Sequence, residues 1–422
     1  MFDTILIFED EFHNNLFPLT YTRPIFDLRC GILTLQEKIE KRFSDKTVIL
    51  HVRDYLNEFV ERSNPSKIIN NIDSNLEKCL LINGSIVADD DLIDTISNIS
   101  ENEILTNGNK MIAALLSGNN LDKVRENLTT SITLSLFEYL PQNEIDADLI
   151  YYPWNLVHRN GIQIAKDFEL LVNRNEEQIL GRVYEGVHML NENDIFVGKG
   201  AVIKPGAVLD AEEGPIYIAQ DATIYPNTVI QGPTAVLEKA LIKIGAKIYG
   251  ETTIGPVCKI SGEIGESILH SYSNKQHNGF LGHAYLGSWV NLGAGTNNSD
   301  LKNNYGTVKV TINDVEIDTG EVMAGLIMGD HSKSGIDTMF NTGTVVGVSA
   351  NVFGSNFPDK YIPSFSWGGA ESSTTFNVDK AIEVAKTVMS RRDIEFLDDD
   401  EKVLRIIYNL TKQERLKRNM PY

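Results

Sequence analysis

Glycine is scarce in the first 180 residues of this 422-residue chain. Of its 32 glycines, 27 lie between Gly181 and Gly369, and only five precede them. Glycine permits tight corners and close approach of backbones, so a strongly uneven distribution indicates two halves that are built differently. The scarcity also leaves no Gly-rich loop after the first apolar run, Ile5–Phe8, which is followed by Glu9-Asp10-Glu11.

Cysteines and cations are also few. Cys30, Cys79 and Cys258 form no CxxC or Cys/His motif, which excludes a zinc ribbon and predicts buried, inert thiols. Lys and Arg together number 38 against 58 Asp and Glu, so the formal net charge is −20. This acidity argues against nucleic acid or an anionic membrane as the main partner, because both would repel the chain.

Long apolar runs are missing as well. No uncharged run approaches the ~18 residues that a transmembrane helix needs. The first residues, MFDTILIFEDEFHNN, lack the basic region of a signal peptide. We therefore expect a cytoplasmic protein in a reducing environment.

Residues 1–180 predict an α/β domain with a mostly parallel sheet, because short apolar runs alternate with helical patterns. The expected strands are Thr4–Phe8, Thr47–His51 and Cys79–Ile82, and the expected helices are Leu33–Phe43, Ile112–Leu116 and a linker helix at Trp154–Leu171.

Residues 181–370 repeat with a period of six. Hexads such as VGKGAV (Val197–Val202), IKPGAV (Ile203–Val208) and LGAGTN (Leu292–Asn297) begin with an aliphatic residue and often carry a small residue at the fifth position. A period of six does not keep one side chain on a fixed face of a helix, but it suits short strands joined by tight corners. The repeat is interrupted at 211–215, 271–279 and 298–318, where binding loops are expected.

The hexads resemble those of left-handed parallel β-helix acyltransferases. Residues 371–422 abandon the repeat and predict amphipathic helices at Val378–Arg391 and Asp400–Arg415. We expect this tail to pack on the end of the solenoid, and a partner-binding helix is the alternative.

The densest polar cluster, residues 274–302, contains two candidate bases, His277 and His283. Acyl transfer from a thioester to an amine needs a base, donors for the developing oxyanion and a groove for the acyl carrier. Histidine suits the base because its pKa lies near neutrality, and Gly293-Ala294-Gly295 exposes backbone N–H groups. The alternative is structural: His283 is a hydrogen-bonded corner residue, and Asn291 and Asn297 form an asparagine ladder.

The sequence HAYLG…VNLGAGT resembles the acetyltransferase stretch of the bifunctional UDP-N-acetylglucosamine diphosphorylase/glucosamine-1-phosphate N-acetyltransferase family, the GlmU type. The resemblance implies a His base, His283 or His277, since the family spacing His-x-x-Tyr is shortened here. It further implies the following roles: Tyr285, Asn291, Asp300 (in place of a family Asn), Lys243 and Lys309 bind the sugar phosphate, and Gly293, Ala294 and Gly295 border acetyl-CoA.

The N-terminal half carries a second part of this resemblance. Phe17–Ile25 is similar to the family motif PLTxxxPKP, with Arg23 near the family Lys, and Pro153–Leu156 is similar to PWDLL. The resemblance implies a sugar-1-phosphate nucleotidyltransferase in which Arg23 contacts phosphate. Asn83, which replaces a metal-binding Asp, joins the substrate site.

In the same reading Glu9 or Asp10 holds Mg²⁺ for a triphosphate. The alternative is a domain kept for packing, with Arg23 paired to the acidic cluster Glu9–Glu11.

Together these patterns predict a homotrimeric enzyme of UDP-N-acetylglucosamine synthesis. It would acetylate glucosamine 1-phosphate from acetyl-CoA and transfer a nucleotidyl group from UTP to N-acetylglucosamine 1-phosphate. Two alternatives stay open. One is a nucleotidyltransferase alone, for example a glucose-1-phosphate thymidylyltransferase, with a non-catalytic solenoid. The other is a non-catalytic binding or scaffold protein.

Overall fold

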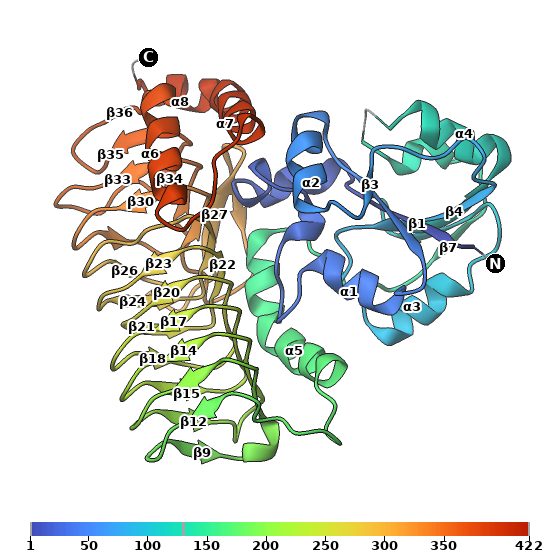
Figure 1. Cartoon of the computed structure of the whole chain (residues 1–422). Coiled ribbons are helices and arrows are strands. Elements are labelled where there is room, and N and C mark those ends of the chain that lie inside the picture. The colour runs from blue at the N-terminus through green and yellow to red at the C-terminus, as the bar shows by residue number, and fades with distance from the viewer. Residues whose placement is uncertain (1, 129–130, 421–422) are drawn as a thin grey trace.

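A computed structural model describes residues 2–128 and 131–420 and shows three parts in contact. An N-terminal α/β domain lies beside a tall solenoid, the helix α5 runs between them, and a helical tail covers the upper flank of the solenoid (Figure 1). No helix of the described residues is both long and apolar enough to cross a bilayer.

The N-terminal domain is built on one seven-stranded sheet with strand order β3-β2-β1-β4-β6-β5-β7. Its strands are β1 (Thr4–Phe8), β2 (Thr47–His51), β3 (Ile68–Ile69), β4 (Lys78–Asn83), β5 (Glu103–Asn107), β6 (Lys110–Ser117) and β7 (Gln142–Glu144). β1 pairs in parallel with β2 and β4, whereas β6 is antiparallel to β4 and β5. The three predicted strands are confirmed, and the sheet is mixed.

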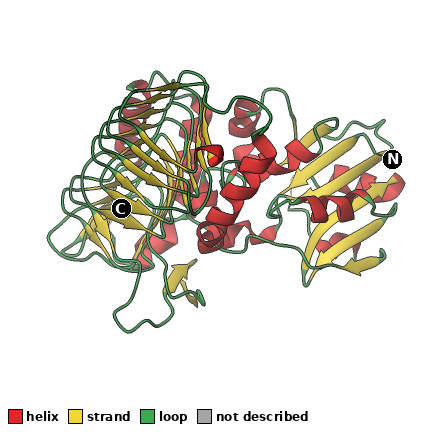
Figure 2. Cartoon of the chain, turned by 90° about the horizontal axis from the view of Figure 1, so that it is seen from below, coloured by secondary structure: helices red, strands yellow, loops and turns green. Residues whose placement is uncertain are grey.

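Helices flank this sheet, as the red ribbons of Figure 2 show. They are η1 (Glu11–Leu16), η2 (Leu19–Tyr21), η3 (Ile25–Asp27), α1 (Leu35–Arg42), η4 (Asp54–Leu56), α2 (Asn57–Ser63), α3 (Asp90–Ser97), α4 (Gly118–Glu126) and η5 (Leu134–Phe137), where η marks a 3-10 helix. α1 begins at Leu35, within the predicted helix, because Thr34 and Glu37 form a capping box.

The predicted helix at Ile112–Leu116 is wrong, because these residues belong to strand β6. The run from Met111 to Leu115 is buried on both faces of the sheet, between β4 and β5. A short apolar run has no periodicity that separates a buried strand from a buried helix, so only the pairing partners decide.

The C-terminal half is a left-handed parallel β-helix with three sheets. Sheet I is β10 (Ile195–Val197), β13 (Ile216–Ile218), β16 (Thr234–Val236), β19 (Thr252–Ile254), β22 (Ile268–Ser271), β25 (Tyr285–Ser288), β29 (Ile327–Met328), β32 (Val345–Val346) and β34 (Tyr361–Ile362). Sheet II is β8 (Arg182–Val183), β11 (Val202–Ile203), β14 (Thr223–Ile224), β17 (Leu241–Ile242), β20 (Lys259–Ile260), β23 (Asn274–Lys275), β30 (Lys333–Ser334), β33 (Asn351–Val352), β35 (Ser366–Gly368) and β36 (Ser373–Thr375). Sheet III is β9 (His188–Leu190), β12 (Val208–Asp210), β15 (Val229–Gln231), β18 (Lys247–Ile248), β21 (Glu263–Gly265), β24 (Phe280–Gly282), β26 (Asn297–Asn298) and β31 (Met339–Phe340); the 3-10 helix η6 (Glu192–Asp194) precedes β10.

The hexad period produces this shape. Thr223 pairs with Leu241, and Leu241 with Lys259, so one coil takes 18 residues, or three hexads. The aliphatic residues that open the hexads point inward: Ile224, Ile242 and Ile260 are fully buried. Corners need left-handed backbone and close stacking, which explains why most glycines lie here.

One predicted interruption is absent, because residues 271–279 contain β23 and continue the coil. The largest real interruption follows β26, where residues 299–325 leave the solenoid and form the hairpin β27 (Lys309–Ile312) and β28 (Val315–Asp318). This hairpin reaches the N-terminal domain, since the Asn313 amide donates to Asn14 O at 3.0 Å.

The tail contains α6 (Val378–Ser390), α7 (Asp398–Leu410) and α8 (Lys412–Lys417), so the second predicted helix is split at Thr411. It joins two parts of the molecule. Arg392 donates to Asn274 Oδ1 of the solenoid at 2.6 Å, and Arg62 of the N-terminal domain donates to Asp400 at 2.7 Å. The tail therefore contacts both domains along their flank, whereas the sequence predicted only that it packs on the end of the solenoid.

Candidate functional site

His283 occupies a corner of the solenoid between β24 and β25, in left-handed backbone with φ +46°. Its side chain is only 9% exposed, and its Nδ1 lies 2.9 Å from Asp300 Oδ2 and 3.5 Å from Glu266 Oε2. An acceptor carboxylate fixes the imidazole proton on Nδ1, which leaves Nε2 as a proton acceptor. This is the geometry of a general base with an orienting acid.

A second histidine closes the corner from the side of α5 (Pro153–Leu171). The rings of His158 and His283 are 5.7 Å apart, and His158 Nε2 lies 3.0 Å from Met323 O. Burial lowers the pKa of His158 and raises the pKa of Glu266. We call Glu266, His283 and Asp300 the corner triad; their ligand atoms lie within 4.8 Å of one another and could also hold a metal ion.

His277, the other candidate base, is exposed between β23 and β24. Its backbone carbonyl accepts a hydrogen bond at 3.0 Å from Lys275, a lysine that points into the solenoid and whose pKa burial lowers to about 8. No described carboxylate pairs with the His277 ring. The structure thus gives an orienting group to His283 alone of the two.

Tyr285 lies two residues beyond His283 but faces another part of the molecule. It is fully buried under the N-terminal domain, where its hydroxyl accepts from the Arg29 N–H at 3.0 Å. Burial raises its pKa. His283 lies in the left-handed corner, whereas Tyr285 is the first residue of β25, so the chain direction changes between them and the two side chains contact different parts of the molecule.

Two other predicted residues, Lys243 and Asn291, lie on sheet II. The backbone of Asn291 forms parallel β-bridges with Asn274 and with Lys333 in this sheet, and Lys243 directly follows β17. Other cations lie near Lys243. The sequence alone did not reveal them, because these cations come from another coil and from the tail. Lys259 has its pKa lowered by burial and by the nearby Arg392, Lys243 and Arg391.

The glycines of the GAG segment are needed by coil stacking. A Cβ on Gly293 would lie 2.3 Å from Gly335 O, and Gly295 has φ +71° beside Asp337. Ala294 O accepts from the Asp337 N–H at 2.7 Å. Lys309, on the exposed hairpin, pairs with Glu316 at 2.8 Å and lies apart from the corner triad.

At the ends of β1 and β4 the acidic residues have protein partners. Glu9 is 2% exposed and pairs with Arg53 at 3.1 Å, while its other oxygen accepts from the Ile25 N–H. Asp10 accepts from Asn83 Nδ2 at 2.9 Å and pairs with Lys110 at 3.5 Å. Because these carboxylate oxygens are occupied by cations and N–H donors, Glu9 and Asp10 do not fit Mg²⁺ as the residues stand.

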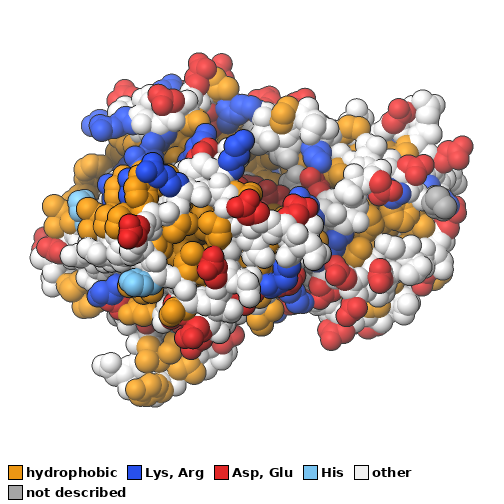
Figure 3. All heavy atoms as spheres, turned by 60° about the horizontal axis from the view of Figure 1, so that its bottom comes forward, with side chains coloured by type: hydrophobic (Ala, Val, Ile, Leu, Met, Phe, Trp, Pro, Cys, Tyr) orange, Lys and Arg blue, Asp and Glu red, His pale blue; other side chains and the backbone are white. Residues whose placement is uncertain are grey.

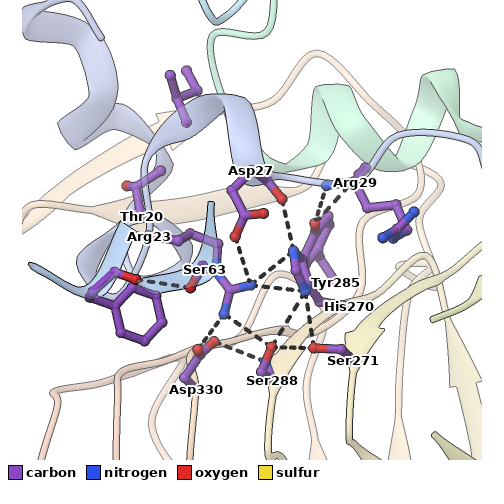
Figure 4. Close-up of polar contacts among 12 residues, drawn as sticks. Thr20, Arg23, Asp27, Arg29, Ser63, His270, Ser271, Tyr285, Ser288 and Asp330 are labelled. Atoms are coloured by element: carbon purple, nitrogen blue, oxygen red, sulfur yellow. Dashed lines mark hydrogen bonds and ion pairs between the residues drawn. The ribbon is translucent and has the colours of Figure 1, made fainter. Parts of the chain in front are cut away.

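Arg23 is buried at the junction of the domains rather than at the strand ends. Its guanidinium forms an ion pair with Asp330 and donates to Ser288 Oγ at 3.1 Å (Figure 4). Asp27 lies 3.6 Å away. The alternative expectation, that Arg23 pairs with the acidic cluster Glu9–Glu11, is wrong. Arg53 pairs with Glu9 instead, and Arg23 contacts the solenoid.

The N-terminal domain contains an open cavity of about 790 Å³ beyond the end of β4. Its polar lining includes Asp89, Asp91, Asp146 and Asp148, with Arg159 as the cation. Arg159 is already paired with Asp148 at 2.6 Å, so the lining is net acidic and its charge does not suit a phosphate, although its volume is that of a small-molecule site.

Comparison with known proteins now adds to this geometry. Residues 5–176 match the family described as "Sugar nucleotidyl transferase". The bifunctional sugar-1-phosphate nucleotidylyltransferase/acetyltransferase of Sulfurisphaera tokodaii is 28% identical over 201 residues, covering 48% of this chain and 43% of that protein. The bifunctional protein GlmU of Synechococcus elongatus is 24% identical over 236 residues, covering 51% and 48%.

Over part of its length, the chain is therefore similar to GlmU-type transferases. It spans about half the length of the curated relatives that it matches. Among solved structures, a UDP-N-acetylglucosamine acyltransferase covers 58% of this chain and 82% of its own at 15% identity, with a TM-score of 0.27.

Proposed function

We propose that this chain is a two-domain sugar-phosphate transferase whose solenoid transfers an acetyl group from acetyl-CoA to the amine of glucosamine 1-phosphate. The observation that supports this best is the hydrogen bond between His283 and Asp300 in a corner that also contains Glu266. A cytoplasmic location would supply both acetyl-CoA and UTP.

In this proposal His283 Nε2 takes the proton that the neutral substrate amine loses as its nitrogen attacks the thioester carbon. The C–S bond then breaks, and the His283 imidazolium gives that proton to the thiolate, which leaves as free CoA. Asp300 stabilises the imidazolium that forms, as an orienting acid does in other acyl-transfer sites. Glu266 adds a second negative charge 3.5 Å from the same nitrogen.

A neighbouring copy would complete the site. The cations near Asn291 lie on sheet II, whereas His283 lies where sheet III meets sheet I, so one copy does not bring them together. Hydrophobic side chains gather over the solenoid in Figure 3, and on sheet III Val229, Tyr249 and Met339 are about 40% exposed. We propose a homotrimer that buries this face, which light scattering after size exclusion tests directly.

The N-terminal domain supports a second activity, nucleotidyl transfer from UTP to N-acetylglucosamine 1-phosphate. Its support is the family match over residues 5–176. Since Glu9 and Asp10 are occupied by Arg53 and Lys110, no step is assigned to Mg²⁺ on these residues.

One set of assays tests the proposal. Free thiol from acetyl-CoA and glucosamine 1-phosphate should appear with the wild type and with His277→Ala, but not with His283→Ala. Loss in His277→Ala alone would move the base to the loop. Pyrophosphate release with UTP, compared with dTTP, tests the N-terminal domain. No turnover in either assay would leave a binding or scaffold protein.

A further inference from the structure

A cavity of about 290 Å³ lies where the N-terminal domain, the solenoid and the tail meet. The first contributes Thr22 and Arg23, the solenoid contributes Trp289 and His331, and the tail contributes Asp400. This volume is at the lower end of small-molecule sites and equals the share of about ten water molecules at ~30 Å³ each. Sites between domains are a common place for ligands.

The charges that line this cavity exclude an anionic ligand. Its guanidinium, Arg23, is already paired with Asp330 and has Asp27 at 3.6 Å, as Figure 4 shows. A third lining carboxylate, Asp400, pairs with Arg62 from outside the lining. A phosphate placed here would face three carboxylates and one neutralised cation, so a sugar phosphate or nucleotide does not suit the cavity.

Two lining polar atoms have no partner among the described residues. Thr22 is 7% exposed, and its Oγ1 makes no hydrogen bond; the same holds for His331 Nδ1. Burial and the nearby Lys333 and Arg23 lower the pKa of His331 to about 3, so its ring is neutral. Such orphan groups destabilise the fold unless a ligand or water satisfies them. Hydroxyl groups of a ligand could pair with both orphan atoms, because a hydroxyl can donate a hydrogen bond and can also accept one.

The rest of the lining is largely aromatic and aliphatic. Trp289 stacks on Tyr272 at 4.2 Å and on His331 at 6.1 Å, and the tail adds Phe396 and Leu404. Ser271 and Ser288 also line the cavity, but their hydroxyls lie 2.7 Å apart and bond to each other, and Ser288 also accepts from Arg23. A lining that mixes apolar surface, two orphan polar atoms and compensated charge matches an uncharged polyol better than it matches an apolar or an ionic molecule.

We propose that this junction cavity binds one uncharged, polyhydroxylated molecule of monosaccharide size. The site is separate from the corner triad: Ser288 ends β25, whereas His283 lies in the corner before it, five residues or at most about 17 Å away along the chain. Because all three parts of the chain line the cavity, an occupant would strengthen their association. The proposal does not depend on the transferase activity, since binding is measured without turnover.

Isothermal titration calorimetry on the full chain tests it with N-acetylglucosamine and glucose, and with glucose 1-phosphate as the charged comparison. We expect one neutral sugar per chain and at least about fivefold weaker binding in the isosteric variant Thr22→Val, which removes one hydrogen bond. Thr374→Val, at an exposed position on β36, should bind as the wild type does.

Two results would overturn the proposal. One is the absence of heat from either neutral sugar at millimolar concentration. The other is binding of glucose 1-phosphate as tight as that of the neutral sugars and unaffected by Thr22→Val. If Thr22→Val fails to fold, tryptophan fluorescence decides: the sugar should change the emission of the wild type but not of Trp289→Phe, which retains Trp154 and Trp367.

Discussion

The strand ends of the N-terminal domain and the corner triad of the solenoid both collect acidic side chains, but they balance charge differently. At the strand ends each carboxylate has a basic partner, Arg53 for Glu9 and Lys110 for Asp10. In the corner triad two carboxylates share one histidine, whose charge depends on its proton. The first arrangement is a closed structural network, and the second can accept and release a proton.

The largest expected effect breaks the corner triad. Asp300→Asn removes the charge that stabilises the His283 imidazolium and allows the wrong tautomer. We expect kcat for thiol release to fall at least about 10²-fold, with an unchanged melting temperature. Glu316→Gln, on the exposed hairpin, is the matched control. An Asp300→Asn enzyme with wild-type activity would show that the corner is only structural.

The next effect concerns the buried cation of the domain junction. Arg23→Met leaves Asp330 buried without its partner, so we expect a loss of about 3–5 kcal/mol in the free energy of unfolding. Denaturant unfolding followed by circular dichroism measures this loss. A loss below 1 kcal/mol would mean that the junction opens readily and that water solvates Asp330.

Acid should weaken the same junction gradually, over several pH units. The folded-state pKa of His331 is lowered to about 3, against about 6.5 in an unfolded chain, so the unfolded state binds the extra proton. Stability from this group is therefore complete above pH 6.5 and falls by up to ~1.4 kcal/mol per pH unit between pH 6.5 and 3. His331→Phe should flatten that part of the pH profile; an identical slope in the variant would refute the assignment.

The smallest effect is expected on the hairpin. Lys309 and Glu316 form an exposed ion pair, and such pairs contribute little. Lys309→Ala should leave the melting temperature unchanged. A marked rise in KM for the sugar phosphate in this variant would nevertheless support the substrate role that the family resemblance implies.

Local pattern predicted much of the fold. The hexads specified the solenoid because each aliphatic residue must point inward once per six residues, and Thr4–Phe8 and Thr47–His51 formed strands as expected. Ile112–Leu116 could not be assigned from its own apolar run, since its strand state depends on pairing with β5 across the turn at Gly108 and with β4, which lies before α3. The candidate site was likewise predicted only in part. The sequence pointed to His283 as a candidate base, but its proximity to Glu266 depends on how the coils stack.

By itself, the sequence determined the repeat, the change of architecture near residue 181 and the two candidate histidines, because periodicity and residue type act locally. Only the tertiary structure decided which charges meet. Arg23 was expected at a phosphate or beside Glu9, yet it pairs with Asp330, 307 residues away. Long-range ion pairs depend on how finished domains dock, and no local pattern encodes that contact.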